Sequence, residues 1–279
     1  MTEKLIGEVV TPEVQTSEHF PGTAATKILS GSSQMEGAAK AAEVLMGYLF
    51  AQGDRNIPGV SYAVAYHLAE VHSGGDIVDV YQFDNDSVAI SIADISGKGP
   101  QAAIHAALIK YGLRAYCSHG LTPEKAMRAM DRLYLENSTF EQVESFASAF
   151  IAMVDPHRRI LAYASAGHEP VVLVHPLVEP RILEPTAPIL GVFEDQHQLF
   201  RQESLELWPG SLLVTSTDGV TEARNAEGEF YGIERLVECI RRSRDAEPSI
   251  IVDRIADSVT AFSGGPWHDD VAILAARFS

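Results

Sequence analysis

Four aspartates stand at the ends of segments whose residue patterns are typical of β-strands. They are Asp76, Asp94, Asp218 and Asp269. Side chains alternate along a strand, so residues two positions apart share a face. Asp94 shares parity with Ile90 and Ile92 in SVAISIAD, and each of the other three aspartates shares parity with apolar residues of its own segment. The pattern therefore predicts four carboxylates on inward-facing strand ends.

Carboxylates that converge in this way need a cation. Taken singly, an aspartate at a strand end more often hydrogen-bonds the local backbone. Two ionised carboxylates about 4 Å apart, however, repel each other by roughly 4 kcal/mol at an effective dielectric constant near 20. Oxygen ligands without competing His or Cys spacing favour Mn²⁺ or Mg²⁺, and a pair of such ions suits phosphoryl chemistry. The sequence thus indicates a centre of hard cations that acts on phosphate groups.

The segments that must position these aspartates fall into clustered strands and clustered helices. Helices are expected over 35–52, 100–118, 122–137, 232–243 and 248–262. Strands are expected at VSYAVAYHL, DIVDVYQF, SVAISIAD, FASAFIAMV, RILAYAS, PVVLVH, HQLFRQESLEL, SLLVTST and DDVAILAARF. Because strands and helices do not alternate regularly, the expected fold class is α+β with mainly antiparallel sheets.

Composition limits the setting and the partners. The 279 residues include 46% hydrophobic and 21% charged side chains, as in ordinary globular proteins. A formal charge of −17 opposes nucleic acid or anionic lipid as a general partner. No apolar run is long enough to span a membrane, and the first residues lack the apolar region of a secretory signal. With only Cys117 and Cys239, which lack metal-site spacing, a cytoplasmic location is expected.

Five motifs give the chain a resemblance to a known family. GGDIVDV, DISGKG, SAGHEP, TDGVTEARN and DDVAIL occur at 74–80, 94–99, 165–170, 217–225 and 269–274. In this order they resemble the SpoIIE/RsbU-type branch of the metal-dependent (PPM, type 2C) protein serine/threonine phosphatases. The resemblance covers roughly residues 57–279. It implies a four-layer αββα sandwich, in which helices flank two antiparallel sheets.

The resemblance also implies a binuclear Mn²⁺ or Mg²⁺ site. Asp94 matches the aspartate that bridges the two ions, and the carbonyl of Ile95 would add a ligand. The other metal aspartates that match are Asp76, Asp218 and Asp269. Asp79 and Asp270 have the opposite parity, and we consider them as residues that support the ligands or bind a third metal.

The implied activity is hydrolysis of phosphoserine or phosphothreonine on a protein by a metal-activated water. The expected substrate is a phosphorylated STAS-domain anti-sigma antagonist in a bacterial partner-switching or stress pathway. A catalytically weak, phosphatase-like signalling scaffold and a hydrolase of small phosphate esters stay open as alternatives. The general acid is unassigned, because Ser96 stands where many eukaryotic-type members have a histidine. Candidates for phosphate binding or proton donation are His72, Lys98 and His168.

Three regions are expected along the chain. Residues 1–34 are rich in Gly, Ser, Thr and Pro and predict a flexible arm. Residues 35–56 predict a helix and linker, whose apolar face either packs on its own domain or, over 35–52, forms a homodimer or signalling contact. Residues 57–279 predict one PPM-type phosphatase domain.

Overall fold

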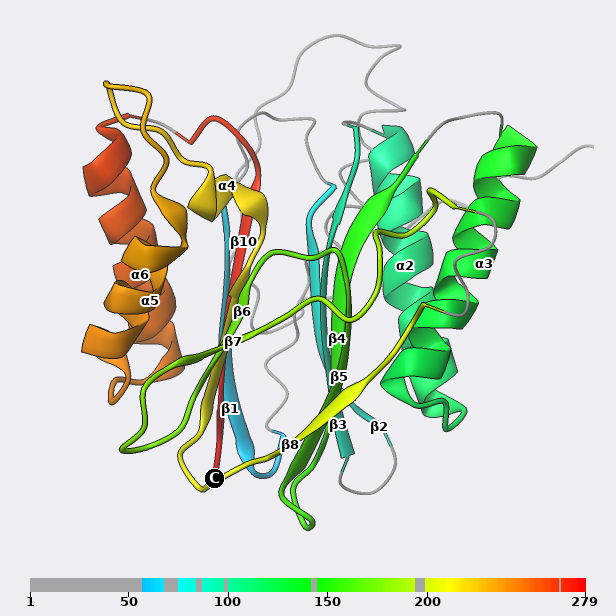
Figure 1. Cartoon of the computed structure of the whole chain (residues 1–279), viewed down its shortest axis with the longest axis horizontal. Coiled ribbons are helices and arrows are strands. Elements are labelled where there is room, and N and C mark those ends of the chain that lie inside the picture. The colour runs from blue at the N-terminus through cyan, green and yellow to red at the C-terminus, as the bar shows by residue number, and fades with distance from the viewer. Residues whose placement is uncertain are drawn as a thin grey trace, which may run out of the picture.

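The structure, a computed structural model, describes residues 57–67, 75–83, 87–97, 100–141, 145–193, 199–265 and 267–279. The arm expected over 1–34 and the helix and linker expected over 35–56 lie outside these residues. The described part forms four layers, with two antiparallel sheets inside and helices on both outer faces (Figure 1). This arrangement confirms the predicted α+β sandwich of the αββα type.

Ten strands of the described chain make up the two inner layers. One sheet, here called the β10 sheet, has the order β1 (Val60–His67), β10 (Val271–Phe278), β9 (Leu212–Ser216), β6 (Val171–Val174) and β7 (Arg181–Leu183). The other, here called the β3 sheet, has the order β2 (Ile77–Phe83), β3 (Ser87–Ile95), β4 (Ala147–Asp155), β5 (Ile160–Ala166) and β8 (Glu203–Glu206). Every neighbouring pair is antiparallel.

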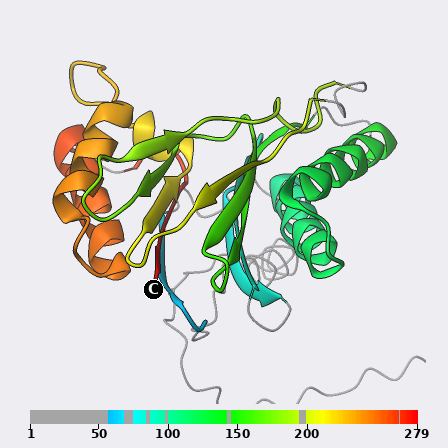
Figure 2. The same cartoon turned by 60° about the horizontal axis from the view of Figure 1, so that its bottom comes forward.

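Each sheet has its own pair of helices on its outer face. The β3 sheet is covered by α2 (Pro100–Ser118) and α3 (Pro123–Glu141), and the β10 sheet by α5 (Gly232–Ser243) and α6 (Pro248–Ser263) (Figure 2). Pro248 opens α6, and Gly264, with φ 68°, ends it in the left-handed conformation that glycine adopts readily. None of the described helices is both long and apolar enough to cross a bilayer.

Both faces of the central strands are buried, and this fixes the layers. In β3, Ile90 and Ile92 belong to the core between the sheets, whereas Ala89 and Ala93 belong to the core under α2 and α3. Branched side chains fill the space between the sheets, and small alanines allow the helices to approach the other face. A shift by one residue would exchange these two faces, so the register of β3 is strongly specified. That register sets which way Asp94 points.

Some elements differ in length from the expectation. Among its described residues, 199–207, the segment HQLFRQESLEL forms a strand only over β8, because Phe200 is buried in the core beneath α2 and α3 instead of extending the ladder. Helix α3 continues past the expected end at 137 and stops at Glu141. Strand β7 and the short helix α4 (Asp218–Thr221) were not predicted, since three or four residues carry no periodic signal.

Candidate metal centre

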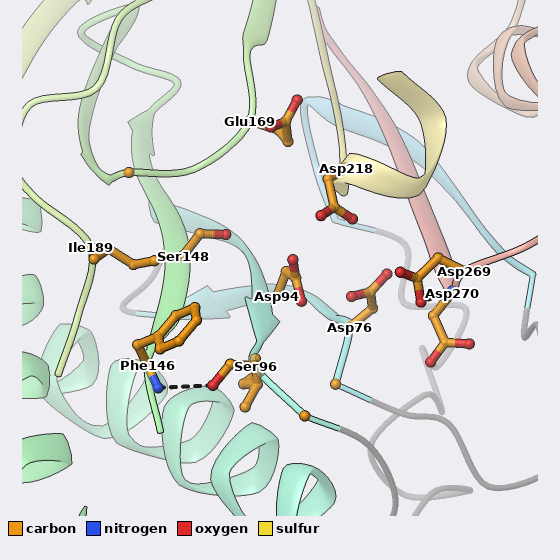
Figure 3. Close-up of a pocket in the computed structure, with 14 residues that line it drawn as sticks. Asp76, Asp94, Ser96, Phe146, Ser148, Glu169, Ile189, Asp218, Asp269 and Asp270 are labelled. Carbon is orange, nitrogen blue, oxygen red and sulfur yellow. Dashed lines mark hydrogen bonds between the residues drawn. The ribbon is translucent and has the colours of Figure 1, made fainter. Parts of the chain in front are cut away.

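A cavity of about 400 Å³ opens at the end of the sandwich where β2 and β10 begin and β3 and β9 end (Figure 3). Its acidic lining residues are Asp76, Asp94, Glu169, Asp218, Asp269 and Asp270. In Figure 3 the carboxylates of Asp76, Asp94 and Asp218 point toward one another from three different segments. The structure thus brings all four predicted ligand aspartates to one pocket.

Asp76 and Asp94 reach the pocket in the way that parity predicted. Asp76 directly precedes β2 and continues the face of Val78, which packs between the sheets. Asp94 lies one residue before the end of β3 and continues the face of Ile92. Both aspartates therefore end the inter-sheet face of a buried strand, and Asp76 is only 4% exposed.

Asp218 and Asp269 reach the same pocket by another route, so the parity reasoning was wrong for these two. Their parity partners, such as Val214 and Val271, pack toward α5 and α6 and not between the sheets. Asp218 lies beyond β9 in the first turn of α4, and Asp269 lies in a bend two residues before β10. The backbone turns at these points, and the turns direct both side chains to the pocket.

Thr217 fixes the orientation of Asp76 across the two sheets. The Thr217 hydroxyl donates to Asp76 Oδ2 at 2.6 Å, and its oxygen accepts the backbone N–H of Ala272 at 2.9 Å. Thr217 is fully buried, so water does not compete for either bond. Asp76 directly precedes β2 of the β3 sheet and Thr217 directly follows β9 of the β10 sheet, so this hydrogen bond holds the two halves of the pocket together.

Crowding of the carboxylates shows in their pKa values. Burial, and after it the nearby Asp94 carboxylate, holds the pKa of Asp76 well above its usual range. Burial together with the Asp269 and Glu169 carboxylates also raises the pKa of Asp94. Burial and the Asp94 charge raise the pKa of Asp218 to about 7. The pocket thus resists holding its full negative charge without a compensating cation.

The donor atoms fit a hard divalent cation. They are carboxylate oxygens and the carbonyl of Ile95, which lies against Gly75 so closely that a Cβ there would approach the Ile95 oxygen to 2.6 Å. Gly219 is similarly tight, because a Cβ would collide with the carbonyl oxygen of Asp270. Among the described residues, no three acidic, His or Cys side chains lie in a ready-made ligand group.

Asp270 and Asp79, which the sequence treats alike, have different surroundings. Asp270 is 7% exposed and lines the pocket, and its backbone N–H donates to Asp269 Oδ1 at 3.0 Å. Asp79 is buried on the opposite face of β2, where Arg114 donates to its two oxygens at 2.9 and 2.6 Å. Lys110 Nζ lies 3.9 Å from it. Asp79 is thus not among the residues that line the pocket, and cations of α2 neutralise its charge; that it supports the ligands or binds a third metal stays a prediction.

Of the three candidates for phosphate binding or proton donation, the structure describes only one. His72 and Lys98 lie outside the described residues. His168 is buried behind the cavity wall, with its Nδ1 atom 2.8 Å from Ser148 Oγ. Burial lowers the pKa of His168 to about 3, so its ring is neutral near pH 7 and does not act as an imidazolium acid.

Two polar residues of the lining were missed by the sequence reasoning. Glu169 belongs to the SAGHEP motif and accepts a hydrogen bond from the Thr221 hydroxyl of α4 at 2.7 Å. Ser148 pairs with Asp94 in the ladder between β3 and β4, which places it on the same wall. The motif already contained the signal for Glu169, but a single serine in a strand carries none.

The raised pKa of Asp218 predicts how the metal-free protein responds to pH. A carboxyl group with a folded-state pKa of about 7 and an ordinary unfolded pKa lowers stability progressively as pH rises between these two values. The variant Asp218→Asn removes this loss. In EDTA at pH 8 we expect its Tm to exceed that of the wild type by about 2–4 °C, roughly 1 kcal/mol in a domain of this size. Partial exposure of Asp218 to solvent keeps the effect that small.

Thermal scans at several pH values check this prediction. The difference between variant and wild type should shrink as the pH falls toward 4, where the folded state is protonated at this position and the unfolded state approaches its own pKa. Asp253→Asn, an exposed aspartate of α6, is the matched control and should show no such trend. A metal-free Asp218→Asn protein less stable than the wild type at pH 8 would contradict the crowding of charge described above.

Comparison with known proteins defines the family. The family model described as Stage II sporulation protein E (SpoIIE) matches residues 84–279. Protein IcfG of Synechocystis sp. is 27% identical over 225 residues, which cover 72% of this chain and 35% of IcfG. Phosphoserine phosphatase RsbU of Bacillus subtilis is 30% identical over 204 residues, which cover 71% of this chain and 58% of RsbU. The chain thus spans between about a third and three-fifths of the length of these relatives.

Solved structures agree on the fold. The SiaA-PP2C domain of Pseudomonas aeruginosa superposes with a TM-score of 0.74 at 18% identity, covering 88% of this chain and 98% of that domain. At this identity the likeness concerns the fold alone. Since the family model matches well over half of the sequence, the chain belongs to the SpoIIE family, and its fold is that of the PP2C domains.

Proposed function

We propose that the chain is a Mn²⁺- or Mg²⁺-dependent phosphatase that removes phosphate from phosphoserine or phosphothreonine on a protein. The observation that supports this most is the group of buried and partly buried, mutually repelling aspartates at one pocket, with pKa values raised above their usual range. Such charge has no structural use there, and a divalent cation would stabilise it. The matched family model and the relative named as a phosphoserine phosphatase favour the same reaction.

Within this proposal each residue has a task. Asp94, central among the carboxylates, would be the ligand that the two ions share, and Asp76, Asp218, Asp269 and the Ile95 carbonyl would be the further ligands. When bound, the two ions would neutralise charge on the phosphoryl oxygens and activate a water for in-line attack. Thr217 keeps Asp76 oriented, so that the ligand is in place before a substrate arrives. The buried Asp270 adds negative charge beside Asp76 and so favours divalent ions.

The partner we propose is a STAS-domain anti-sigma antagonist phosphorylated on serine, in a bacterial partner-switching or stress pathway. Support comes from RsbU and from Phosphoserine phosphatase RsbP of Bacillus subtilis, 28% identical over 159 residues. It also comes from a structural neighbour, 20% identical, whose description concerns the bacterial stressosome. A cytoplasmic location, a phosphatase domain over 57–279 and a homodimer through 35–52 belong to the same proposal.

A phosphate-release assay tests the function. The purified chain is incubated with a serine-phosphorylated STAS protein, with free phosphoserine and with an aryl phosphate, each in Mn²⁺, Mg²⁺ or EDTA. We expect release that needs the divalent ion and is fastest on the folded protein. Release from the small esters alone would favour a metabolite hydrolase, and Mn²⁺ binding without any release would favour a signalling scaffold. Comparing the phosphoserine proteins of cells with and without the active chain then identifies the natural substrate.

A further inference from the structure

Ser148 occupies a special position on the wall of the metal pocket. It is the second residue of β4 and pairs with Asp94 across the ladder, so its backbone is held by the strand that presents the central aspartate. In Figure 3 its hydroxyl points toward the space bordered by Asp94 and Glu169. A short side chain on a central strand has little freedom to move, which suits a group that must keep one direction.

His168 holds this hydroxyl from behind. Its Nδ1 atom lies 2.8 Å from Ser148 Oγ, the ring is fully buried, and Nε2 has no hydrogen-bond partner among the described residues. A neutral imidazole carries one ring proton, and a buried N–H without a partner is rarer in proteins than a buried acceptor without one. The proton therefore belongs on Nδ1, where it is donated to Ser148, and the Ser148 proton stays available on the pocket side.

A second hydroxyl of the pocket has the same arrangement. Ser96 Oγ accepts the backbone N–H of Phe146 at 2.9 Å, so its own proton is also available to the cavity (Figure 3). No Lys or Arg occurs among the described residues that line the cavity. A phosphoryl group bound there can thus receive hydrogen bonds from neutral donors in addition to the charge of the metals.

We propose that the Ser148 hydroxyl donates a hydrogen bond to a phosphoryl oxygen of the bound substrate, and that His168 is a positioning residue that sets the direction of this hydrogen bond. The inference rests on the proposed phosphatase function and identifies a phosphate-recognition group of the same site. No proton leaves Ser148 and no bond to it forms, so the residue binds and orients the phosphoryl group without reacting.

Orthophosphate binding provides the test, because it measures the phosphate site without turnover. Calorimetry of the Mn²⁺-loaded protein should show that Ser148→Ala weakens the Kd of orthophosphate roughly 10- to 100-fold, the range for a hydrogen bond to a charged group. Mn²⁺ affinity should stay unchanged. Ser91→Ala, which removes a buried hydroxyl on the helix-facing side of β3, is the matched control and should bind orthophosphate like the wild type.

His168 variants separate positioning from packing. His168→Asn keeps an N–H donor near the place of Nδ1 and should bind orthophosphate more tightly than His168→Ala, which has no donor. If His168→Ala does not fold, the nitrogen chemical shifts of the His168 ring in the Mg²⁺-loaded wild type still report the tautomer. A proton on Nε2 overturns the inference, as does a Ser148→Ala protein that binds orthophosphate within twofold of the wild type.

The outcome for the inference can be told apart from that for the function. If the wild type is active and Ser148→Ala keeps the same KM and orthophosphate affinity, the phosphatase function stands and the role of Ser148 is excluded. If the wild type binds Mn²⁺ but neither hydrolyses phosphate esters nor binds orthophosphate, both the phosphatase function and the role of Ser148 are excluded. A rise in KM for Ser148→Ala with little change in kcat indicates that the hydrogen bond forms already with the bound substrate. A loss in kcat as large as the loss in kcat/KM indicates that it forms only in the transition state.

Discussion

Replacing Asp94 by Asn is expected to lower kcat/KM for Mn²⁺-dependent ester hydrolysis by at least about 100-fold while the protein stays folded. Asparagine has nearly the same shape, but it removes the negative charge that the proposed role of Asp94 as a metal ligand requires. Replacing a residue that only supports a metal ligand typically lowers metal affinity or activity by about 10- to 100-fold. Replacing the central ligand itself should therefore lower activity by at least the upper value. Steady-state kinetics with an aryl phosphate, together with calorimetry of Mn²⁺ binding, measure both consequences.

The fold should tolerate this change well. Burial and neighbouring carboxylates raise the pKa of Asp94, so the neutral amide relieves repulsion in the metal-free protein. A Tm in EDTA at or above that of the wild type would show that lost activity does not come from unfolding. Asp253→Asn on the exposed face of α6 serves as the activity control. Full activity of Asp94→Asn would exclude the bridging role.

Asp79→Asn should have the opposite effect to Asp94→Asn. We expect a large loss in the free energy of unfolding and an unchanged affinity for Mn²⁺. Asp79 and Lys110 are each 3% exposed in their side chains, and Asn leaves the cations of α2 facing an uncharged group. Breaking a buried ion pair from one side costs about 3–5 kcal/mol. We expect the lower end, about 3 kcal/mol in urea unfolding, because the Arg114 side chain is 33% exposed and can turn to solvent.

A second substitution shows whether charge causes this loss. Burial already lowers the pKa of Lys110, although Asp79 opposes the shift, and replacing both residues together should therefore recover part of the stability. The double variant Asp79→Asn/Lys110→Met is expected to unfold at a higher urea concentration than Asp79→Asn alone. The increase in Tm on adding Mn²⁺ should be the same in wild type and both variants. A smaller increase in the Tm of the variants would indicate that Asp79 contributes to metal binding.

The sequence predicted correctly which aspartates meet at the pocket, but it predicted less well how the backbone brings each of them there. Alternation along β2 and β3 identified Asp76 and Asp94 correctly, since both strands are buried on both faces and their register is fixed. Alternation failed for Asp218 and Asp269, because these residues lie in a helical turn and a bend where period two no longer holds. The ordered family motifs, not the strand pattern, identified the second pair.

Partners that come from distant segments were beyond the reach of sequence reasoning. Asp79 looked like a metal residue because its motif contains one, but Lys110 and Arg114, four residues apart on one face of α2, neutralise it. His168 looked like a proton donor, yet its contact with Ser148 depends on how β4 and the loop after β5 pack. Serine and threonine occur throughout the chain, so only the folded structure distinguishes Ser148 and Thr217 from the rest.

Strand β10 has a practical consequence for handling the protein. It begins beside Asp269 and Asp270 and ends at Phe278, where Ser279 donates its N–H to the Gly59 carbonyl at 3.0 Å. Its eight residues extend roughly 27 Å, at about 3.4 Å per residue, from the pocket to the opposite end of the sandwich (Figure 1). A fluorescent label or resin attached after Ser279 would therefore leave the carboxylate cavity open to a large incoming protein, which makes capture of a phosphorylated partner on immobilised protein practicable.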